Sequence, residues 1–532
     1  MQDLEVKTAD EQAAIGICAL SACELARRVA SGAITARAAV EAYIARIEQV
    51  NGKLNAVVVK RYDAARREAD AIDQRRARGE TLPPLAGVPI TVKECLDVAG
   101  TPSTFGLPAR AKQLADHDDP YVARMQEAGA IVLAKTNAAQ LLIFVETDNP
   151  VYGPTKNPWN PERSGGGSSG GEGAILGAGG SPLGLGTDIG GSVRIPAHFC
   201  GLTSIRPTAG RAPDAGRASV PIGQRGVVSQ VGPMARSVDD LALALGIING
   251  GHGLDHEAVV PLGDFRSVDV SRLRVAVLED DGVMPPSPAI ARAVREAAEI
   301  LKAAGADVVT CDLPSLAEGM KIFFACVSGD RAAGLRRTAR GGKVDPRAGR
   351  MIGIGGLPPG VRRGLAGVLA LVGQRGLARS MRLFAGGSAA AYWDAIEQQM
   401  DYRAAFRAAL DNHPGGVVDL ILMPPFGVPA VRHGATANMP FAGTYSILSP
   451  LLGYPAGVVP LTRVRPDEQE VRKTSFDVVE KTAWDTDRGS AGLPVGVQIL
   501  GRPWRDDVVL AAMKTIETAA RKKSDFPLTA PL

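Results

Sequence analysis

Short apolar runs of strand type alternate with longer helical patterns along most of this 532-residue chain. The strand-type runs lie at 87–92, 130–134, 273–278, 306–310, 418–423, 457–461 and 495–500. Helical patterns at 121–127 and 288–304 separate the first two pairs of runs. This alternation is typical of βαβ units, whose strands pair in a parallel or mixed sheet. The sequence therefore predicts an α/β fold built on an extended, mixed, twisted β-sheet flanked by helices.

No Pro/Ser-rich linker divides these segments, which favours a single large domain over several. Residues 1–60 are predicted to form an N-terminal helical arm packed on the main domain, residues 61–532. Ser21 and Thr35 each stand at an N-cap position before a helical pattern, and the second pattern is expected to stop at Asn51-Gly52. The polar, charged stretch 463–490 is expected to form a surface insertion or hairpin.

Composition excludes several classes of protein. The net charge is only +4, from 60 basic and 56 acidic residues, and aromatic residues make up 5%, so a nucleic-acid binder is not expected. The six cysteines form no CxxC pair and indicate small buried side chains in a reducing compartment. No signal peptide or membrane-spanning run is visible, so a cytoplasmic location is expected. The six histidines are dispersed, and neither a metal nor a cofactor is expected.

One segment departs from this even charge balance. Residues 321–386, the basic segment, hold 13 Lys/Arg against 2 Asp/Glu, a local charge of +11. Leu365, Val368, Leu369 and Val372 share one helical face, and Leu377, Met381 and Phe384 share another. The arginines set among them are Arg362, Arg363, Arg375, Arg379 and Arg382. Such basic amphipathic helices are typical of membrane-surface elements, so 361–384 is expected to contact an anionic bilayer peripherally. Packing on the core or on the second subunit of a homodimer is an equal alternative.

Two clusters of glycine and serine mark the candidate site. The first spans Ser164 to Gly173, the second spans Thr187 to Ser192, and Ser192 follows Ser168 by 24 residues. Glycine is favoured where main-chain N–H groups approach a ligand or where φ is positive. These clusters therefore predict a backbone that closes around a reacting group, with serine hydroxyls beside it.

Three general motifs can be laid over the first cluster. Gly165-x-Gly167-x-x-Gly170 matches a dinucleotide fingerprint, but no strand-type run precedes it. Gly166-x-Ser168-x-Gly170 matches a nucleophile elbow, which His413 or His433 could serve as base. Ser-x-x-Lys is absent from the chain. A serine nucleophile with a lysine base is the remaining interpretation. The candidate base is Lys93, at the end of an apolar strand where burial would lower the pKa of its amine.

Taken together, these segments resemble the amidase signature family over nearly the whole chain. The matching segments are 87–94, 165–173, 184–197, 232–237 and 492–501. The resemblance implies a Ser-Ser-Lys triad in which Ser192 is the nucleophile, Ser168 the bridging serine and Lys93 the final proton acceptor. It also implies a cis peptide bond between Gly167 and Ser168.

The residues around the triad have expected roles as well. The main-chain N–H groups of Ile189, Gly190, Gly191 and Ser192 are expected to face the developing oxyanion. Ser169 and Asp188 are candidates for orienting Lys93 or its water, with a role as turn residues an equal alternative. Arg194 is expected to brace the loop by pairing with an acidic residue. Leu142, Ile143, Phe144 and Val145 are expected to line a hydrophobic substrate tunnel or to form a buried strand.

Segments 149–159 and 455–462 are similar to the branch of the family that hydrolyses fatty acid amides. The expected activity is hydrolysis of a fatty acid amide or other hydrophobic carboxamide to an acid and an amine through an acyl-enzyme. An arylamidase or carbamate/ester hydrolase with the same triad is one alternative. A subunit of amidotransferase type that works in a complex is another.

Overall fold

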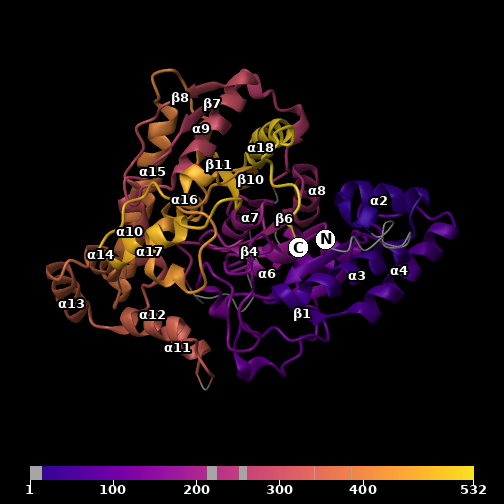
Figure 1. Cartoon of the computed structure of the whole chain (residues 1–532), viewed down its shortest axis with the longest axis horizontal. Helices are drawn as coiled ribbons and strands as arrows, with labels where there is room; N and C mark the ends of the chain where they lie inside the picture. The colour runs from indigo at the N-terminus through magenta and orange to yellow at the C-terminus, as the bar shows by residue number, and fades with distance from the viewer. Residues whose placement is uncertain (1–14, 213–223, 251–259, 341, 385, 532) are drawn as a thin grey trace, which may run out of the picture.

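An eleven-stranded β-sheet forms the centre of the computed structural model of this chain (Figure 1). The structure describes residues 15–212, 224–250, 260–340, 342–384 and 386–531. The strands are β1 (Val57–Lys60), β2 (Pro89–Lys93), β3 (Ile131–Thr136), β4 (Leu183–Asp188), β5 (Thr203–Arg206), β6 (Gln230–Ala235), β7 (Arg274–Val277), β8 (Asp307–Val309), β9 (Leu420–Met423), β10 (Ala456–Arg463) and β11 (Pro494–Gly501).

The sheet is mixed, with the order β1-β3-β2-β4-β6-β5-β10-β11-β9-β7-β8. Strand β2 pairs in parallel with β3 and β4, and β7 pairs in parallel with β8 and β9. The remaining neighbours are antiparallel. All seven strand-type runs of the sequence correspond to strands of this sheet. The prediction of one large α/β domain around a mixed sheet is confirmed.

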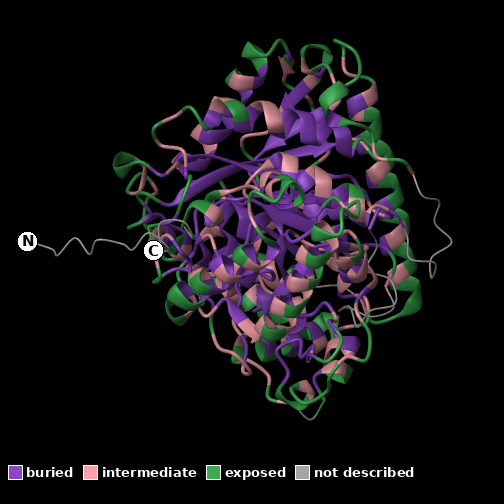
Figure 2. Ribbon diagram, turned by 90° about the vertical axis from the view of Figure 1, so that its right-hand side faces the viewer, coloured by how far each residue is buried: buried purple, intermediate pink, exposed green. Residues whose placement is uncertain are grey.

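Helices surround the sheet, whose central strands are buried, while exposed residues lie on the outer sides of the helices and in the edge strands β1 and β8 (Figure 2). The helices are α2 (Ala22–Ser31), α3 (Ala36–Leu54), α4 (Tyr62–Ala77), α5 (Pro120–Glu127), α6 (Gly170–Gly177), α7 (Arg194–Cys200), α8 (Val238–Ile248), α9 (Pro288–Ala303), α10 (Leu316–Val327), α11 (Ala333–Thr338), α12 (Pro346–Gly356), α13 (Pro359–Leu371), α14 (Arg375–Leu383), α15 (Ala389–Asp411), α16 (Thr444–Leu452), α17 (Val478–Asp487) and α18 (Asp506–Ala520). None of these helices is both long and apolar enough to cross a bilayer.

The N-terminal helices begin where their capping residues predict. Ser21 accepts a hydrogen bond from the Glu24 N–H and caps α2, and Thr35 accepts one from the Ala38 N–H and caps α3. The expected stop of α3 at Asn51-Gly52 is wrong, because the helix continues to Leu54. The Asn51 side chain accepts from the N–H groups of Ala56 and Val57, so it secures the turn after the helix instead of ending it.

The polar stretch 463–490 is not a hairpin, because it contains helix α17. Asp477 caps this helix by accepting a hydrogen bond from the Val479 N–H. Val479 and Ala483 are buried on its inner side. Because most residues of this stretch are polar, the sequence pattern did not predict a helix with a short buried face.

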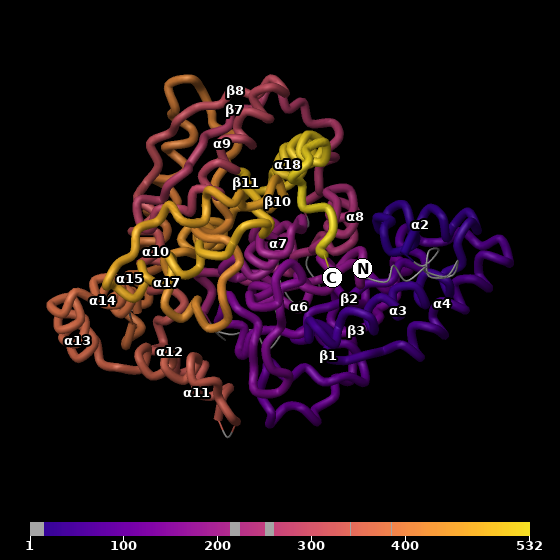
Figure 3. Tube along the Cα trace, in the orientation of Figure 1, coloured from indigo at the N-terminus to yellow at the C-terminus, as the bar shows by residue number. Residues whose placement is uncertain are grey.

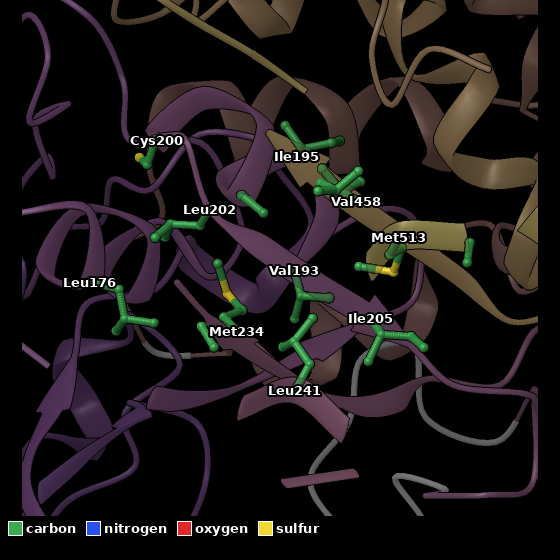
Figure 4. Packing of buried hydrophobic residues seen from close by; sticks show 14 of the residues in the cluster. Leu176, Val193, Ile195, Cys200, Leu202, Ile205, Met234, Leu241, Val458 and Met513 are labelled. Carbon is green, nitrogen blue, oxygen red and sulfur yellow. The ribbon is translucent and has the colours of Figure 1, made fainter. Parts of the chain in front are cut away.

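The residues that follow Ser192 are anchored in the core. Val193 and Ile195 pack in a cluster with Met234, Leu241 and Val458 (Figure 4). This packing fixes the start of α7, and with it the loop that joins β4 to α7. The basic segment, in contrast, lies at the opposite end of the molecule from α2 and α4 (Figure 3).

Candidate active site

Lys93 is the last residue of β2, and its side chain is completely buried. Its Nζ lies 2.7 Å from Oγ of Ser168 and 2.9 Å from Oγ1 of Thr187. The Thr187 carbonyl oxygen lies 3.4 Å from the same nitrogen. A lysine at a strand end is usually solvated, so its burial against a serine hydroxyl is the distinctive feature of this site. No local sequence pattern indicates Thr187 as a partner of Lys93.

The loop that carries Ser168 is held tightly against its neighbours. The Gly167–Ser168 peptide bond is cis. A Cβ atom at Gly167 would lie 2.6 Å from the Glu146 nitrogen, so only glycine fits this position. The Ser168 carbonyl accepts hydrogen bonds from the Ala139 N–H and the Thr147 hydroxyl. These contacts fix the position of the Ser168 hydroxyl beside Lys93.

Ser192 lies in the loop between β4 and α7, and its side chain is 6% exposed. The Ser169 N–H donates to the Ser192 carbonyl over 3.2 Å, which brings the two serine loops together. The Ser169 hydroxyl donates to the Thr187 carbonyl over 3.5 Å. The site thus collects Lys93 from β2, Ser168 and Ser169 from the loop before α6, and Ser192 from the loop after β4.

Asp188 stabilises the loop that carries Ser192. Its carboxylate accepts from the N–H groups of Gly191 and Val193 and forms a 2.9 Å ion pair with Arg194. Burial opposes ionisation of this carboxyl, but the charges of Arg194 and Arg206 and the hydrogen bonds from Arg194 and Gly191 hold its pKa below its usual range. Asp188 therefore supports the backbone of the loop, and Arg194 pairs with an acidic residue as the sequence analysis expects.

The glycines of this loop fit the space they occupy. Gly191 has φ of +115°, and a Cβ atom there would lie 2.7 Å from Cβ of Ser446. The Gly191 N–H is one of the four expected oxyanion donors, and it donates to Asp188 over 2.8 Å. The N–H groups of Ile189, Gly190 and Ser192 are therefore the donors that remain for an oxyanion.

Two apolar side chains that the sequence analysis did not select lie beside this loop. A Cβ atom at Gly190 would lie 3.6 Å from Phe323 and 3.9 Å from Ile447. Phe323 comes from α10 and Ile447 from α16, and both are largely buried. Their sequence distance from Gly190 explains why no local pattern indicated them.

The apolar run Leu142 to Val145 is half-buried, begins at the last residue of the short 3-10 helix Gln140–Leu142, and does not form a strand. Leu142 and Val145 pack against the main core. Ile143 packs against a smaller cluster that includes Leu141 and Ile352 of α12. The Arg347 guanidinium lies over the Phe144 ring, and the distance from Arg347 Cζ to the ring centroid is 6.0 Å. The four predicted substrate-binding residues therefore divide between the core and the basic segment.

The basic segment contacts the region around Leu142 to Val145 through hydrogen bonds and an ion pair. The Gln140 side chain donates to the Lys343 carbonyl and accepts from the Asp345 N–H. Arg347 forms a 2.6 Å ion pair with Asp148. These contacts hold the start of α12 over the Gln140–Asp148 region.

The histidines do not serve Ser168. His413 is half-buried and His433 is exposed, and their Nε2 atoms contact the carbonyl oxygens of Thr310 and Pro161. The nucleophile-elbow interpretation therefore lacks its base at Ser168, whose hydroxyl contacts Lys93. Within the described ranges, no group of three or more His, Cys, Asp or Glu side chains could hold a metal ion.

The sequence and the fold match known amide-cleaving proteins. A family model described as amidase matches residues 38–510. Fatty-acid amide hydrolase 1 of Sus scrofa is 34% identical over 514 residues, which cover 94% of this chain and 86% of the relative. A glutamyl-tRNA(Gln) amidotransferase subunit of Synechococcus sp. (strain WH7803) is 31% identical over 94% of this chain and 97% of the relative. A solved fatty acid amide hydrolase structure superposes with a TM-score of 0.78 and 26% identity, covering 96% of this chain and 86% of that one.

Proposed function

Because this chain belongs to the amidase family of amide-hydrolysing enzymes, we propose that it cleaves a hydrophobic carboxamide through an acyl-enzyme on Ser192. In this proposal Ser168 relays the proton and Lys93 receives it. The contact of 2.7 Å between Lys93 Nζ and Ser168 Oγ, inside a completely buried position, is the observation that carries the proposal. A buried lysine favours its neutral form, which is the form that can act as a base.

The reaction follows from these contacts. Neutral Lys93 takes the Ser168 proton while Ser168 takes the Ser192 proton, and Ser192 Oγ bonds to the acyl carbon. The N–H groups of Ile189, Gly190 and Ser192 stabilise the oxyanion, and loss of one such donor typically raises the barrier by about 3 kcal/mol. The proton then returns through Ser168 to the amine nitrogen as the C–N bond breaks. Water hydrolyses the acyl-enzyme ester to the carboxylic acid by the same relay.

The surroundings of the oxyanion loop favour an apolar acyl group. Phe323 and Ile447 lie beside Gly190, and Leu142, Ile143, Phe144 and Val145 supply further apolar surface near the Ser168 loop. An arylamidase or carbamate/ester hydrolase would use the same residues. A panel of amides, anilides, carbamates and esters of graded acyl length ranks these alternatives by kcat/KM, and preference for a short polar acyl group would contradict the hydrophobic site.

The similarity to the Synechococcus amidotransferase subunit favours an alternative function, in which this chain is a subunit of amidotransferase type. Such a protein would cleave its amide within a complex, whereas the proposal requires activity of the isolated chain. Hydrolysis of a hydrophobic amide by the purified protein alone separates the two.

Labelling with a fluorophosphonate probe and peptide mapping tests the nucleophile. An adduct confined to Ser192, lost in Ser192→Ala, supports the proposal. Ser181→Ala is the matched control, because Ser181 is equally buried but donates to the Leu183 carbonyl outside the site. An adduct on Ser168, or unchanged labelling of Ser192→Ala, would contradict it.

We also propose that α13 docks peripherally on an anionic bilayer. Its apolar residues are exposed, with Leu365 at 45%, Val368 at 59% and Leu371 at 88%. Arg362, Arg363 and Arg382 line an adjacent pocket of about 600 Å³ between α13 and α14. Arg363 and Arg382 are exposed beside these apolar side chains, and such a surface suits contact with lipid acyl chains and phosphate groups. The same face could instead be covered by a second copy of the chain in a homodimer, in which case light scattering gives a dimer and anionic liposomes do not retain the protein.

A further inference from the structure

Glu172 is a completely buried carboxyl group that the proposed mechanism does not use. It lies in the first turn of α6, four residues after Ser168. An acidic residue is favoured at a helix N-terminus, but this side chain points into the sheet and contacts two strands.

Two threonine hydroxyls hold the Glu172 carboxyl. Thr91 of β2 donates to its Oε2 over 2.7 Å, and Thr136 of β3 donates to its Oε1 over 2.8 Å. Thr91 precedes Lys93 by two residues and therefore points to the same side of β2. Thr136 is the register partner of Lys93 across the parallel pair. The carboxyl thus joins the helix that follows Ser168 to the strands beside Lys93.

The neighbouring strand β4 leaves room for this carboxyl. A Cβ atom at Gly184 would lie 2.0 Å from Glu172 Oε2, so no other residue is compatible with the present position of Glu172. Gly184 is followed three residues later by Thr187, which contacts Lys93 Nζ. Strands β2, β3 and β4 therefore meet at Glu172, and β2 and β4 also carry Lys93 and Thr187.

Lys93 of β2 is the charged group that acts on Glu172 among the residues described. The other charges of the adjoining strands are engaged elsewhere. Lys135 of β3 donates to the Pro102 carbonyl and to Ser103, and Asp188 of β4 pairs with Arg194. Burial raises the pKa of Glu172 to about 8, against the lowering effect of the two threonines and of Lys93.

Resting on the proposed function, we infer that Glu172 is a positioning residue for Lys93. Its carboxyl group ties Lys93 to the Ser168 loop and its charge controls when Lys93 is the uncharged base. A carboxylate at this place favours the ammonium form of Lys93, and an uncharged carboxyl does not. Ionisation of Glu172 therefore moves the pH at which acylation begins.

Replacement of Glu172 by glutamine separates the two parts of this role. Glutamine can accept from one threonine and donate to the other, so the contacts are kept while the charge is lost. We expect Glu172→Gln to retain the maximal rate of Ser192 labelling, with the acidic limb of the pH–rate profile displaced by about half a pH unit or more toward lower pH. Glu172→Ala, which loses both contacts, is expected to label roughly tenfold more slowly at every pH.

Glu517→Gln is the matched control, because Glu517 is equally buried in α18 but pairs with Lys514 and Arg521. Its pH–rate profile should superpose on that of the unaltered protein. Thr136→Val keeps the shape of the side chain and removes one donor to the carboxylate, so it should displace the limb in the same direction by a smaller amount. If Glu172→Gln does not fold, the pH–rate profile of Thr136→Val tests the role of Glu172 instead.

The outcomes separate this inference from the proposed function. If Ser192 is not labelled in the unaltered protein, the proposed function is wrong. If Ser192 is labelled normally but Glu172→Gln, or Thr136→Val in its place, has an unshifted profile, the role of Glu172 is overturned and the proposed function stands.

Discussion

Around Lys93, titratable side chains are buried and hydrogen-bonded, whereas along α13 Arg363 and several apolar side chains are exposed next to one another. Lys93, Glu172 and Asp188 are each at most 1% exposed, and their partners come from several strands and loops. Leu365 and Leu371 of α13, in contrast, are 45% and 88% exposed. Buried titratable groups are tolerated only when they have fixed hydrogen-bond partners, and exposed apolar faces are typical of surfaces that another molecule covers. The first region is therefore built for chemistry and the second for contact.

Removing the buried base should have the largest effect. Lys93→Met keeps the apolar stem and deletes the amine, so we expect Ser192 labelling to slow by ~10³-fold with the fold retained. Stopped-flow labelling and circular dichroism measure the two quantities. Lys135→Met is the control, because Lys135 is also completely buried but contacts Pro102 and Ser103. Equal loss of labelling in both variants would show that burial, and not proton acceptance, is what matters.

Loss of the charge on Asp188 should cost the most stability. Asp188→Asn leaves Arg194 completely buried without its ion partner, and breaking such a pair costs about 3–5 kcal/mol of unfolding free energy. Urea unfolding measures this value. Glu318→Gln, which breaks an exposed pair with Lys321, should change the unfolding free energy by less than ~1 kcal/mol. A similar loss of unfolding free energy in the two variants would contradict the distinction between the buried and the exposed ion pair.

His198 gives the buried region a pH dependence. Burial lowers the pKa of His198 from 6.5 to about 4, with its Nδ1 accepting from the Gly496 N–H. Between these pH values the unfolded chain binds a proton that the folded chain does not, so stability falls as the pH is lowered through this window, by about 3 kcal/mol in total. His198→Gln should flatten this part of the curve of unfolding free energy against pH. A curve that His198→Gln leaves unchanged between these pH values would contradict the assignment.

Charge placed on α13 should affect binding without affecting stability. Leu371→Asp combined with Leu365→Asp is expected to weaken retention by anionic liposomes by about tenfold and to change the unfolding free energy by less than ~0.5 kcal/mol. Leu114→Asp, at a residue 62% exposed outside the basic segment, is the control and should bind liposomes normally. If the double variant floats with anionic liposomes as the unaltered protein does, α13 is not the membrane contact. If the unaltered protein is a dimer and the double variant is a monomer, this face is the interface between two copies of the chain.

Local patterns predicted much of the fold. The apolar runs became strands, and Ser21 and Thr35 became helix caps, because both signals lie within a few neighbouring residues. Lys93 and Ser168, which lie 2.7 Å apart, could be selected as candidates from the sequence, since each residue lies in a distinctive motif. Thr187, Glu172, Phe323 and Ile447 were missed because their roles depend on which distant segments the fold brings together. Helix α17 was missed because Val479 and Ala483 are its only fully buried apolar residues, and most of their neighbours are polar.

The central claim is that a proton passes through Ser168 between Lys93 and Ser192, and a matched amide and ester of the same acyl group test it directly. The amine leaving group needs the returning proton, whereas an alcohol leaving group depends on it less. The account predicts that Ser168→Ala lowers kcat/KM for the amide by roughly tenfold or more beyond its effect on the ester. An equal loss on the two substrates would contradict the relay.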